Sequence, residues 1–208
     1  MEKKCYRQYC LYVCKGWLLS LKTLGVNAMI KNSCAFTGHR PHRFPWDNED
    51  DFRCVALKKM LAEQISTLVR RGVTAFYSGM AEGTDSYCSR IVLDLRKENP
   101  ALKLHCILPH EGQADKWKAS ARERYFAILE QADSVEYVSH TYYDGCMIDR
   151  NHRLVESAEL LLAVYNGTRR SGTGATVNYA RKLGREIIVI NPVTLNIVHG
   201  VSTLDFKL

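Results

Sequence analysis

Short apolar runs alternate with longer amphipathic stretches along most of the chain. The runs are apolar at consecutive positions and are bounded by turn-forming residues; they cover residues 33–36, 73–77, 102–108, 134–139, 160–165 and 186–191. A strand that is apolar at every position is buried on both faces, as the strands of parallel sheets are. The pattern therefore predicts strands of one mostly parallel sheet.

Stretches of helical length separate these runs. In the first stretch the apolar residues recur every three or four positions and end before Gly72, a residue type favoured just after a helix; they are Phe52, Val55, Ala56, Met60, Leu61, Ile65 and Leu68. Further helices are predicted over 84–97, 115–132, 148–157 and 176–183. Regular alternation of strands and helices predicts an α/β fold, a Rossmann-like doubly wound sheet with helices on both faces.

The predicted domain covers residues 29–208, and residues 1–28 have a different character. The first 28 residues hold five Lys or Arg against one Glu, which is +4 of the formal net charge of +7, so that the remainder carries about +3. Lys15 and Lys22 interrupt the apolar positions, which disfavours a secretory signal. We expect an extension outside the fold, with a membrane-surface helix as the alternative.

The composition excludes several classes of protein. With 208 residues, of which 46% are hydrophobic and 25% charged, the chain is expected to form one globular domain rather than a disordered polymer. No run reaches the ~18 apolar residues of a membrane span. Eight cysteines occur without a C-x-x-C pair, and the cluster of Cys5, Cys10 and Cys14 lacks a fourth ligand. We expect reduced cysteines, a cytoplasmic protein and no metal site.

Three loops that follow predicted strands have the composition of a phosphate-binding site. Glycines let backbone N–H groups approach a ligand, and N–H groups at a helix N-terminus attract anions. The candidate ligand-binding residues are Thr37, Gly38, His39 and Arg40 in the first loop; Ser78, Gly79, Met80, Ala81, Glu82, Gly83 and Asp85 in the second; Ser171, Gly172, Thr173, Gly174 and Thr176 in the third; and Arg150 and Asn151 at the start of another helix. The carboxyl ends of parallel strands share one edge, so these loops are expected to meet there.

Each group also has a purely structural interpretation. Asp85 could cap or stabilise the first turn of its helix without a ligand. Arg150 could clamp a phosphate, or with Asn151 tie the start of its helix to neighbouring loops. The sequence leaves these alternatives open.

Four blocks together resemble a known family. FTGHRP at 36–41, SGMAEGTD at 78–85, DRNHRLVESAELLLAVYNG at 149–167 and SGTGATVNYARKLGREIIVINP at 171–192 resemble the YpsA-like branch of the SLOG superfamily. That superfamily includes the DNA-processing proteins DprA/Smf and the LOG-type phosphoribohydrolases. The resemblance implies a Rossmann-like fold and a nucleotide or nucleotide-derived ligand, of the ADP-ribose or NAD type.

The two better-known relatives imply different activities. LOG-type hydrolases carry PGGxGTxxE with a catalytic glutamate; here Asn178 stands at the glutamate position and Ala175 at the threonine position. An amide cannot act as a general acid or base, so hydrolysis is not expected unless Asp85, Glu82 or Asp149 substitutes. DprA-like proteins bind single-stranded DNA, but a charge of about +3 outside the first 28 residues does not favour a long nucleic-acid groove.

The resulting hypothesis is a protein that binds a nucleotide-type ligand at the carboxyl edge of its sheet, with a sensor role as one interpretation. No residue is assigned as catalytic. A single-stranded DNA-binding module and an N-glycosidic hydrolase are the alternatives. Ligand identity and homo-oligomerisation are left open.

Deleting residues 1–28 is expected to leave the fold intact, because the first predicted strand begins after Met29. Thermal unfolding of the truncated and full-length chains should give cooperative transitions whose Tm values differ by less than about 4 °C, the shift that ~1 kcal/mol produces at this size. Loss of the cooperative transition in the truncated chain would contradict this domain boundary.

Overall fold

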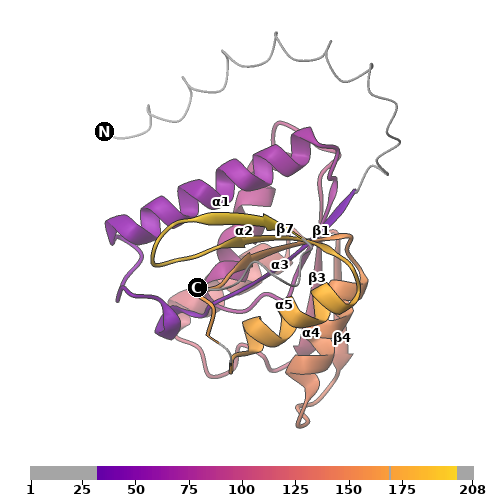
Figure 1. Cartoon of the computed structure of the whole chain (residues 1–208). Helices are drawn as coiled ribbons and strands as arrows, with labels where there is room; N and C mark the ends of the chain where they lie inside the picture. The colour runs from indigo at the N-terminus through magenta and orange to yellow at the C-terminus, as the bar shows by residue number, and fades with distance from the viewer. Residues whose placement is uncertain (1–31, 169, 201–208) are drawn as a thin grey trace, which may run out of the picture.

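The computed structural model describes residues 32–168 and 170–200 (Figure 1). The strands are β1 (Ser33–Gly38), β2 (Ala75–Ser78), β3 (Lys103–His110), β4 (Ser134–Ser139), β5 (Leu160–Val164), β6 (Glu186–Ile190) and β7 (Ile197–Gly200). The helices are α1 (Phe52–Arg70), α2 (Thr84–Arg96), α3 (Ala119–Leu129), α4 (Cys146–Glu156) and α5 (Gly172–Lys182), with a 3-10 turn at Pro41–Arg43. The predicted extension at 1–28 and its three cysteines lie outside the described residues.

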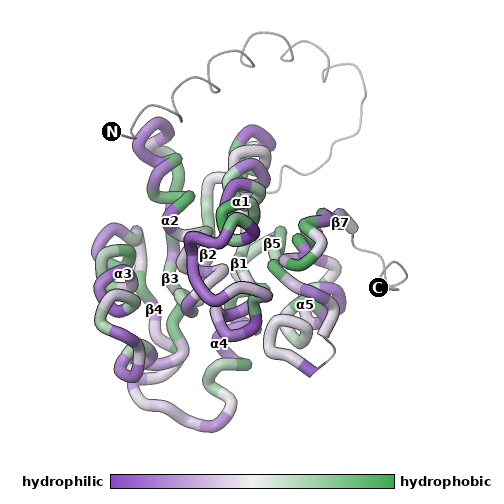
Figure 2. The backbone as a smooth tube through the Cα atoms, turned by 90° about the vertical axis from the view of Figure 1, so that its left-hand side faces the viewer, coloured by the Kyte–Doolittle hydropathy of each residue, from purple (hydrophilic) through white to green (hydrophobic). Residues whose placement is uncertain are grey.

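The strands form one seven-stranded sheet in the order β4-β3-β2-β1-β5-β6-β7, which Figure 2 shows from one end of the row to the other. β1 to β6 are parallel, and β7 is antiparallel to β6. The predicted fold, a mostly parallel Rossmann-like α/β sheet, is confirmed. From β1 the chain builds outward through β2, β3 and β4, then returns to β5 on the other side of β1. The gap between β1 and β5 is thus the topological switch point, where ligands of such sheets bind.

Side chains of the central strands point alternately into two apolar layers. Phe36 of β1 and Leu162 of β5 belong to the layer formed with α1, α2 and α3, whereas Ala35 and Leu161 belong to the layer formed with α4 and α5. Figure 1 shows α1 and α2 above the strands and α4 and α5 below them. Burial on both faces explains why these strands are apolar at consecutive positions.

The largest differences from the predicted elements lie at three places. Helix α5 begins at Gly172, four residues before the predicted start, because the Ser171 side chain caps it by accepting a hydrogen bond from the N–H of Gly174 at 3.0 Å. Helix α3 begins at Ala119, four residues after the predicted start at 115, because residues 111–117 form turns and a bend. Strand β7 was not predicted; the chain turns back to it at Leu195, whose φ is 57°.

None of the described helices combines the length and the apolar character that crossing a membrane requires. In the longest of them, α1, the buried residues Cys54, Leu57, Leu61, Ile65 and Leu68 recur every three or four positions and face the sheet, whereas Phe52 and Val55 are exposed. This spacing is the amphipathic pattern of a helix that covers a sheet in water.

Candidate functional site

A cavity of about 260 Å³ lies at the carboxyl ends of β1 and β5. We call it the switch-point cleft. Its walls come from β1 and the loop after it, the β2–α2 loop, α4 and the start of α5. The lining residues are Phe36, Thr37, Gly38, His39, Arg40, His42, Arg43, Ala81, Asp85, Met147, Arg150, Asn151, Leu154, Ser171, Gly172 and Thr173.

The first turn of α5 offers unused hydrogen-bond donors to the cleft. Ser171 satisfies the N–H of Gly174, but in the part of the chain that the structure describes no acceptor takes the N–H groups of Gly172 and Thr173. A Cβ atom built at Gly172 would meet no atom within 4 Å, so the backbone faces open space. Free N–H groups and the positive end of the helix dipole make this turn suitable for an anion.

Two arginines after β1 add positive charge to the rim of the cleft. Arg40 and Arg43 are both exposed, and neither forms an ion pair with a described carboxylate. The Nη2 atom of Arg40 lies 4.0 Å from the sulfur of Met147 on α4, a weak contact that leaves its other donors free. Guanidinium groups bind phosphate oxygens in pairs of parallel hydrogen bonds, so this rim complements a phosphate.

His39 joins the two sides of the switch point. Its Nε2 atom lies 2.9 Å from Oδ1 of Asn166 in the loop after β5, and its backbone N–H donates to the carbonyl of Val164 at 3.1 Å. From the other direction, the Thr84 hydroxyl donates to the carbonyl of His39 at 3.1 Å. Burial lowers the pKa of His39 below its ordinary value. A neutral His39 therefore holds the wall of the cleft rather than supplying a cation.

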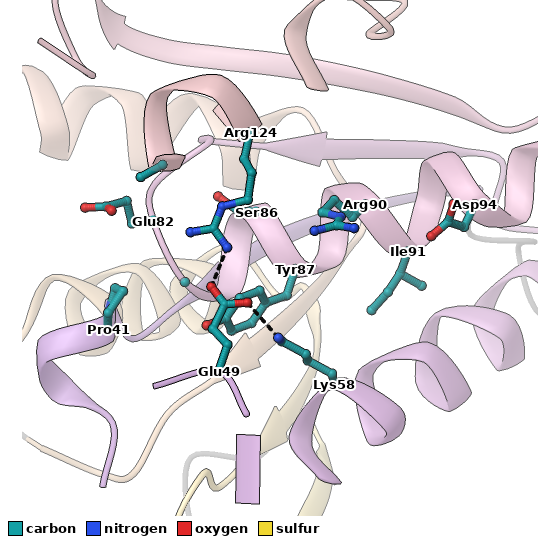
Figure 3. Close-up of a pocket in the computed structure, with 12 residues that line it drawn as sticks. Pro41, Glu49, Lys58, Glu82, Ser86, Tyr87, Arg90, Ile91, Asp94 and Arg124 are labelled. Carbon is teal, nitrogen blue, oxygen red and sulfur yellow. Dashed lines mark hydrogen bonds and ion pairs between the residues drawn. The ribbon is translucent and has the colours of Figure 1, made fainter. Parts of the chain in front are cut away.

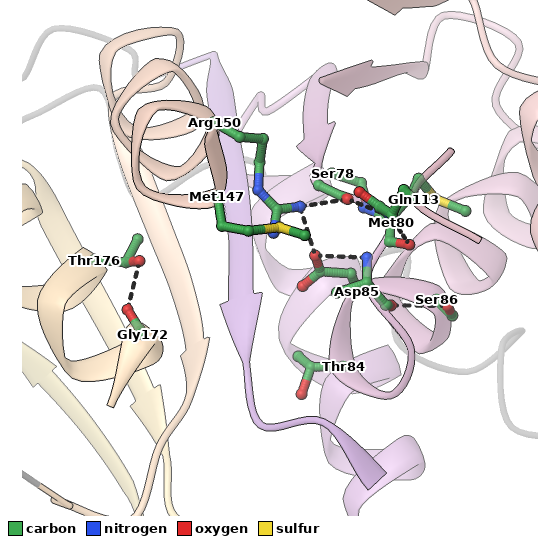
Figure 4. A network of polar contacts seen from close by, with 12 residues as sticks. Ser78, Met80, Thr84, Asp85, Ser86, Gln113, Met147, Arg150, Gly172 and Thr176 are labelled. Carbon is green, nitrogen blue, oxygen red and sulfur yellow. Dashed lines mark hydrogen bonds and ion pairs between the residues drawn. The ribbon is translucent and has the colours of Figure 1, made fainter. Parts of the chain in front are cut away.

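A buried ion pair closes the inner end of the cleft (Figure 4). The side chains of Arg150 on α4 and Asp85 on α2 are 5% and 6% exposed, and Nη1 lies 3.8 Å from Oδ2. The guanidinium also donates to the carbonyl of Gly79, while Asp85 accepts from the N–H of Ala81 at 3.1 Å. Burial raises the pKa of Asp85, and the charge of Arg150 opposes that rise. The pair ties α4 to the β2–α2 loop and neutralises the carboxylate of the cleft.

The glycines of the three candidate loops serve different purposes. At Gly79 a Cβ atom would overlap the guanidinium of Arg150, and at Gly38 it would overlap the side chain of Thr84. At Gly174 it would lie 2.8 Å from the Tyr165 hydroxyl oxygen. Among these positions, Gly172 alone faces space that a ligand could occupy. The other three glycines let segments of this chain pack closely against one another.

The cleft brings together many, but not all, of the residues proposed from the sequence. It gathers Thr37, Gly38, His39, Arg40, Ala81, Asp85, Arg150, Asn151, Ser171, Gly172 and Thr173. Ser78, Gly79, Met80, Gly174 and Thr176 are buried and do not line it, and Glu82 and Gly83 line a neighbouring pocket. Met80 and Ala81 use their N–H groups inside their own loop, on Ser78 and Asp85. A ligand role for these residues remains a prediction.

Sequence reasoning missed part of the lining. His42 and Arg43 follow the FTGHRP block directly, and their basic character next to a proposed phosphate loop was a usable signal. Met147 and Leu154 lie three residues before and four after Arg150, on the face of α4 that packs at the cleft. Assigning that face required knowing that Arg150 points inward.

The neighbouring pocket, of about 320 Å³, lies between α1, α2 and α3 (Figure 3). Its central carboxylate, Glu49, pairs with Lys58 at 2.7 Å and with Arg124 at 2.6 Å. These charges satisfy one another and hold the loop before α1 against two helices. The pocket thus offers less to an anion than the switch-point cleft does.

Two further observations concern the hydrolase glutamate position and the possible metal ligands. Asn178, at the position of the hydrolase glutamate, is exposed on α5, accepts a hydrogen bond from Arg181 at 3.1 Å and does not line the cleft. Within the described residues, no group of three His, Cys, Asp or Glu side chains is placed to hold a metal ion.

Comparison with known proteins identifies relatives of the chain. The profile of the YspA SLOG family matches residues 34–195, which include the whole cleft. A UPF0398 protein of Bacillus velezensis is 31% identical over 134 residues, 64% of this chain and 74% of the relative; one of Bacillus pumilus is 30% identical over 64% and 72%. The fold is similar to that of DNA processing protein A from Helicobacter pylori, with a TM-score of 0.52 and 16% identity, over 78% of this chain but only 66% of that one.

Exchanging single glycines separates structural from ligand-facing positions. Gly79→Ala is expected to lower the free energy of unfolding by several kcal/mol, approaching the ~3–5 kcal/mol cost of breaking a buried ion pair, because its Cβ displaces Arg150. Gly172→Ala, the matched control, should change it by less than about 1 kcal/mol, toward greater stability. Urea unfolding measures both values; equal effects of the two variants would contradict the assignment.

His39 should make folding stability depend on pH. A histidine whose pKa is lowered by burial stabilises the fold fully above its unfolded pKa of about 6.5, and this contribution is lost as the pH falls below that value. The free energy of unfolding should therefore fall more between about pH 7.5 and 5.5 in the natural protein than in His39→Gln. An equal or larger fall in the variant would show that His39 is not the group responsible.

Proposed function

We propose that this chain, which belongs to the YspA SLOG family, binds a nucleotide or nucleotide-derived ligand by its phosphate group in the switch-point cleft. One observation carries this proposal. Among the described residues, the N–H groups of Gly172 and Thr173 have no acceptor and the guanidinium groups of Arg40 and Arg43 have no carboxylate partner, and all four residues line the same cavity. An anion is the ligand class that satisfies all of these donors at once.

The electrostatic balance of the cleft supports the same class of ligand. Its carboxylate, Asp85, is paired with Arg150, so the charges of Arg40 and Arg43 are left over. Each charge-assisted hydrogen bond to a phosphate contributes on the order of 1.5–3 kcal/mol. A few such bonds, with the dipole of α5, suffice for specific binding of a small phosphorylated ligand.

We propose binding rather than hydrolysis. The exposed Asn178 lies outside the cleft, and Asp85, the carboxylate nearest the proposed phosphate, is already held by the N–H of Ala81 and by Arg150. A group held in this way positions the loop instead of attacking a substrate. The free, buried state of the five described cysteines fits a reducing compartment such as the cytoplasm.

Single-stranded DNA is the second candidate ligand, because the similar structure from Helicobacter pylori is described for its single-stranded DNA binding mode. Arg40, Arg43 and Arg170 are exposed near the cleft and could contact a nucleic-acid backbone. The salt dependence distinguishes the two ligands. A protein that neutralises several phosphates shows a steep fall of log K with log salt, whereas one phosphate gives a shallow slope.

Calorimetric titration with nucleoside monophosphates, ADP-ribose, NAD and a short single-stranded oligonucleotide tests the proposal. At least one small ligand should bind, and Arg40→Ala or Arg43→Ala should each weaken binding about 10- to 150-fold, the equivalent of losing one charge-assisted bond. Arg122→Ala, an exposed arginine on α3 outside the cleft, serves as the control and should change nothing.

The opposite pattern would defeat the nucleotide hypothesis. Tight binding of the oligonucleotide with a steep salt slope, and no heat with any small ligand, would favour the nucleic-acid function. Binding of a small ligand that both arginine variants leave unchanged would place the site elsewhere.

A further inference from the structure

A second and larger cavity, of about 820 Å³, lies beside the switch-point cleft at the carboxyl ends of β3 and β4. We call it the β3–β4 groove. Its walls are the end of β3 at His110, the turn around Gln113 and the loop from β4 to α4 at Tyr142. Met147 lines both the groove and the cleft, so the two spaces adjoin along one edge of the sheet.

The β2–α2 loop separates the two spaces. From the cleft, Arg150 donates to the carbonyl of Gly79; from the groove, Nε2 of Gln113 donates to the same carbonyl at 3.2 Å and to that of Met80 at 2.8 Å. Figure 4 shows Arg150 and Gln113 on opposite sides of this loop. Since a buried ion pair and an amide both hold it, the partition is a fixed part of the site.

The groove differs from the cleft in its chemistry. Its charged residues are Glu111 and Asp115 against Lys116, so it carries no excess of positive charge for a second phosphate. It does hold an exposed aromatic pair: the rings of His110 and Tyr142 meet edge to face with centroids 5.6 Å apart, and Tyr142 is 62% exposed. The Tyr142 hydroxyl donates to Asp144 at 3.1 Å, which restrains the ring.

An exposed, restrained aromatic ring suits a flat uncharged group. Base–aromatic stacking contributes about 1–3 kcal/mol per base and tolerates every base, because each presents a π-face. The volumes of the two cavities also favour a ligand that extends from the cleft into the groove. At about 260 Å³ the cleft falls below the roughly 300–1,000 Å³ of common ligand sites, while the neighbouring groove lies within that range.

We infer that the groove is a base-binding subsite: the ligand is a nucleotide whose phosphate lies in the switch-point cleft and whose base stacks on Tyr142 in the β3–β4 groove. This inference rests on the proposed function and adds the part of the ligand that the cleft does not recognise. Tyr142 then determines specificity for nucleotides over other phosphorylated compounds, such as sugar phosphates.

Titration with AMP, GMP, CMP, UMP and ribose 5-phosphate tests the subsite. At least one nucleotide should bind about 5- to 150-fold more tightly than ribose 5-phosphate, the range that base stacking covers. Tyr142→Ala should remove this preference without weakening ribose 5-phosphate. Tyr142→Phe keeps the ring and should retain the preference within about threefold.

Tyr143→Ala is the matched control, since this neighbouring tyrosine lines neither space and should leave the preference unchanged. Because Tyr142 is exposed, the variants should unfold at the same temperature as the natural protein. Equal binding of ribose 5-phosphate and all four nucleotides, or a preference that survives Tyr142→Ala, would overturn the base subsite and leave the proposed function standing. If no nucleotide and no sugar phosphate binds, or if Arg40→Ala and Arg43→Ala have no effect, the proposed function fails, and the subsite fails with it.

Discussion

The contact of the Arg150 guanidinium with Gly79 and Asp85 organises the carboxyl edge of the sheet. It joins α4 to the β2–α2 loop, explains why position 79 must be glycine, and cancels the charge of Asp85. Removing one partner of a buried pair leaves an uncompensated charge, which costs about 3–5 kcal/mol, so the loop and the helix are tied as a unit. Because Arg150 balances this carboxylate, the charges of Arg40 and Arg43 remain as the positive excess of the cleft.

The edge is divided into two spaces with different chemistry. On one side of the β2–α2 loop lie the free N–H groups of α5 and the arginines after β1; on the other lie His110 and Tyr142 with nearly balanced charges. The family match covers both spaces, whereas the similarity to the Helicobacter pylori protein, at 16% identity, extends to the fold alone. The arrangement favours one ligand with an anionic end and a flat, uncharged end.

The sequence predicted the fold well where local pattern and burial agree. The central strands are apolar at consecutive positions, throughout the strand in β5, because both faces are covered, and α1 begins and ends close to the expected residues. Strand β7 was not predicted because it has only four residues, none of them fully buried, and these carry no such pattern. Gly172 and Gly174 suggested a loop, yet the Ser171 cap makes them the first turn of α5, a distinction that depends on one side-chain hydrogen bond.

The site was harder to predict than the fold, because spacing shows which residues meet but not which way they face. The glycines at 79 and 172 look equivalent in the sequence, but one packs against Arg150 and the other faces open space. From the sequence, His39 was a candidate hydrogen-bond donor to a ligand. In the structure it is buried and hydrogen-bonded to Asn166, which gives it a structural role. Only long-range contacts, between residues more than 70 positions apart, decide these cases.

The central claim is that the free N–H groups at the start of α5 bind a phosphate. Titrating the ¹⁵N-labelled protein with AMP, and following each backbone amide by NMR, tests it directly and detects even weak binding. The account predicts that the amide signals of Gly172 and Thr173 shift downfield and are among those that move most. Saturable shifts confined to other parts of the protein, with Gly172 and Thr173 unchanged, would contradict it.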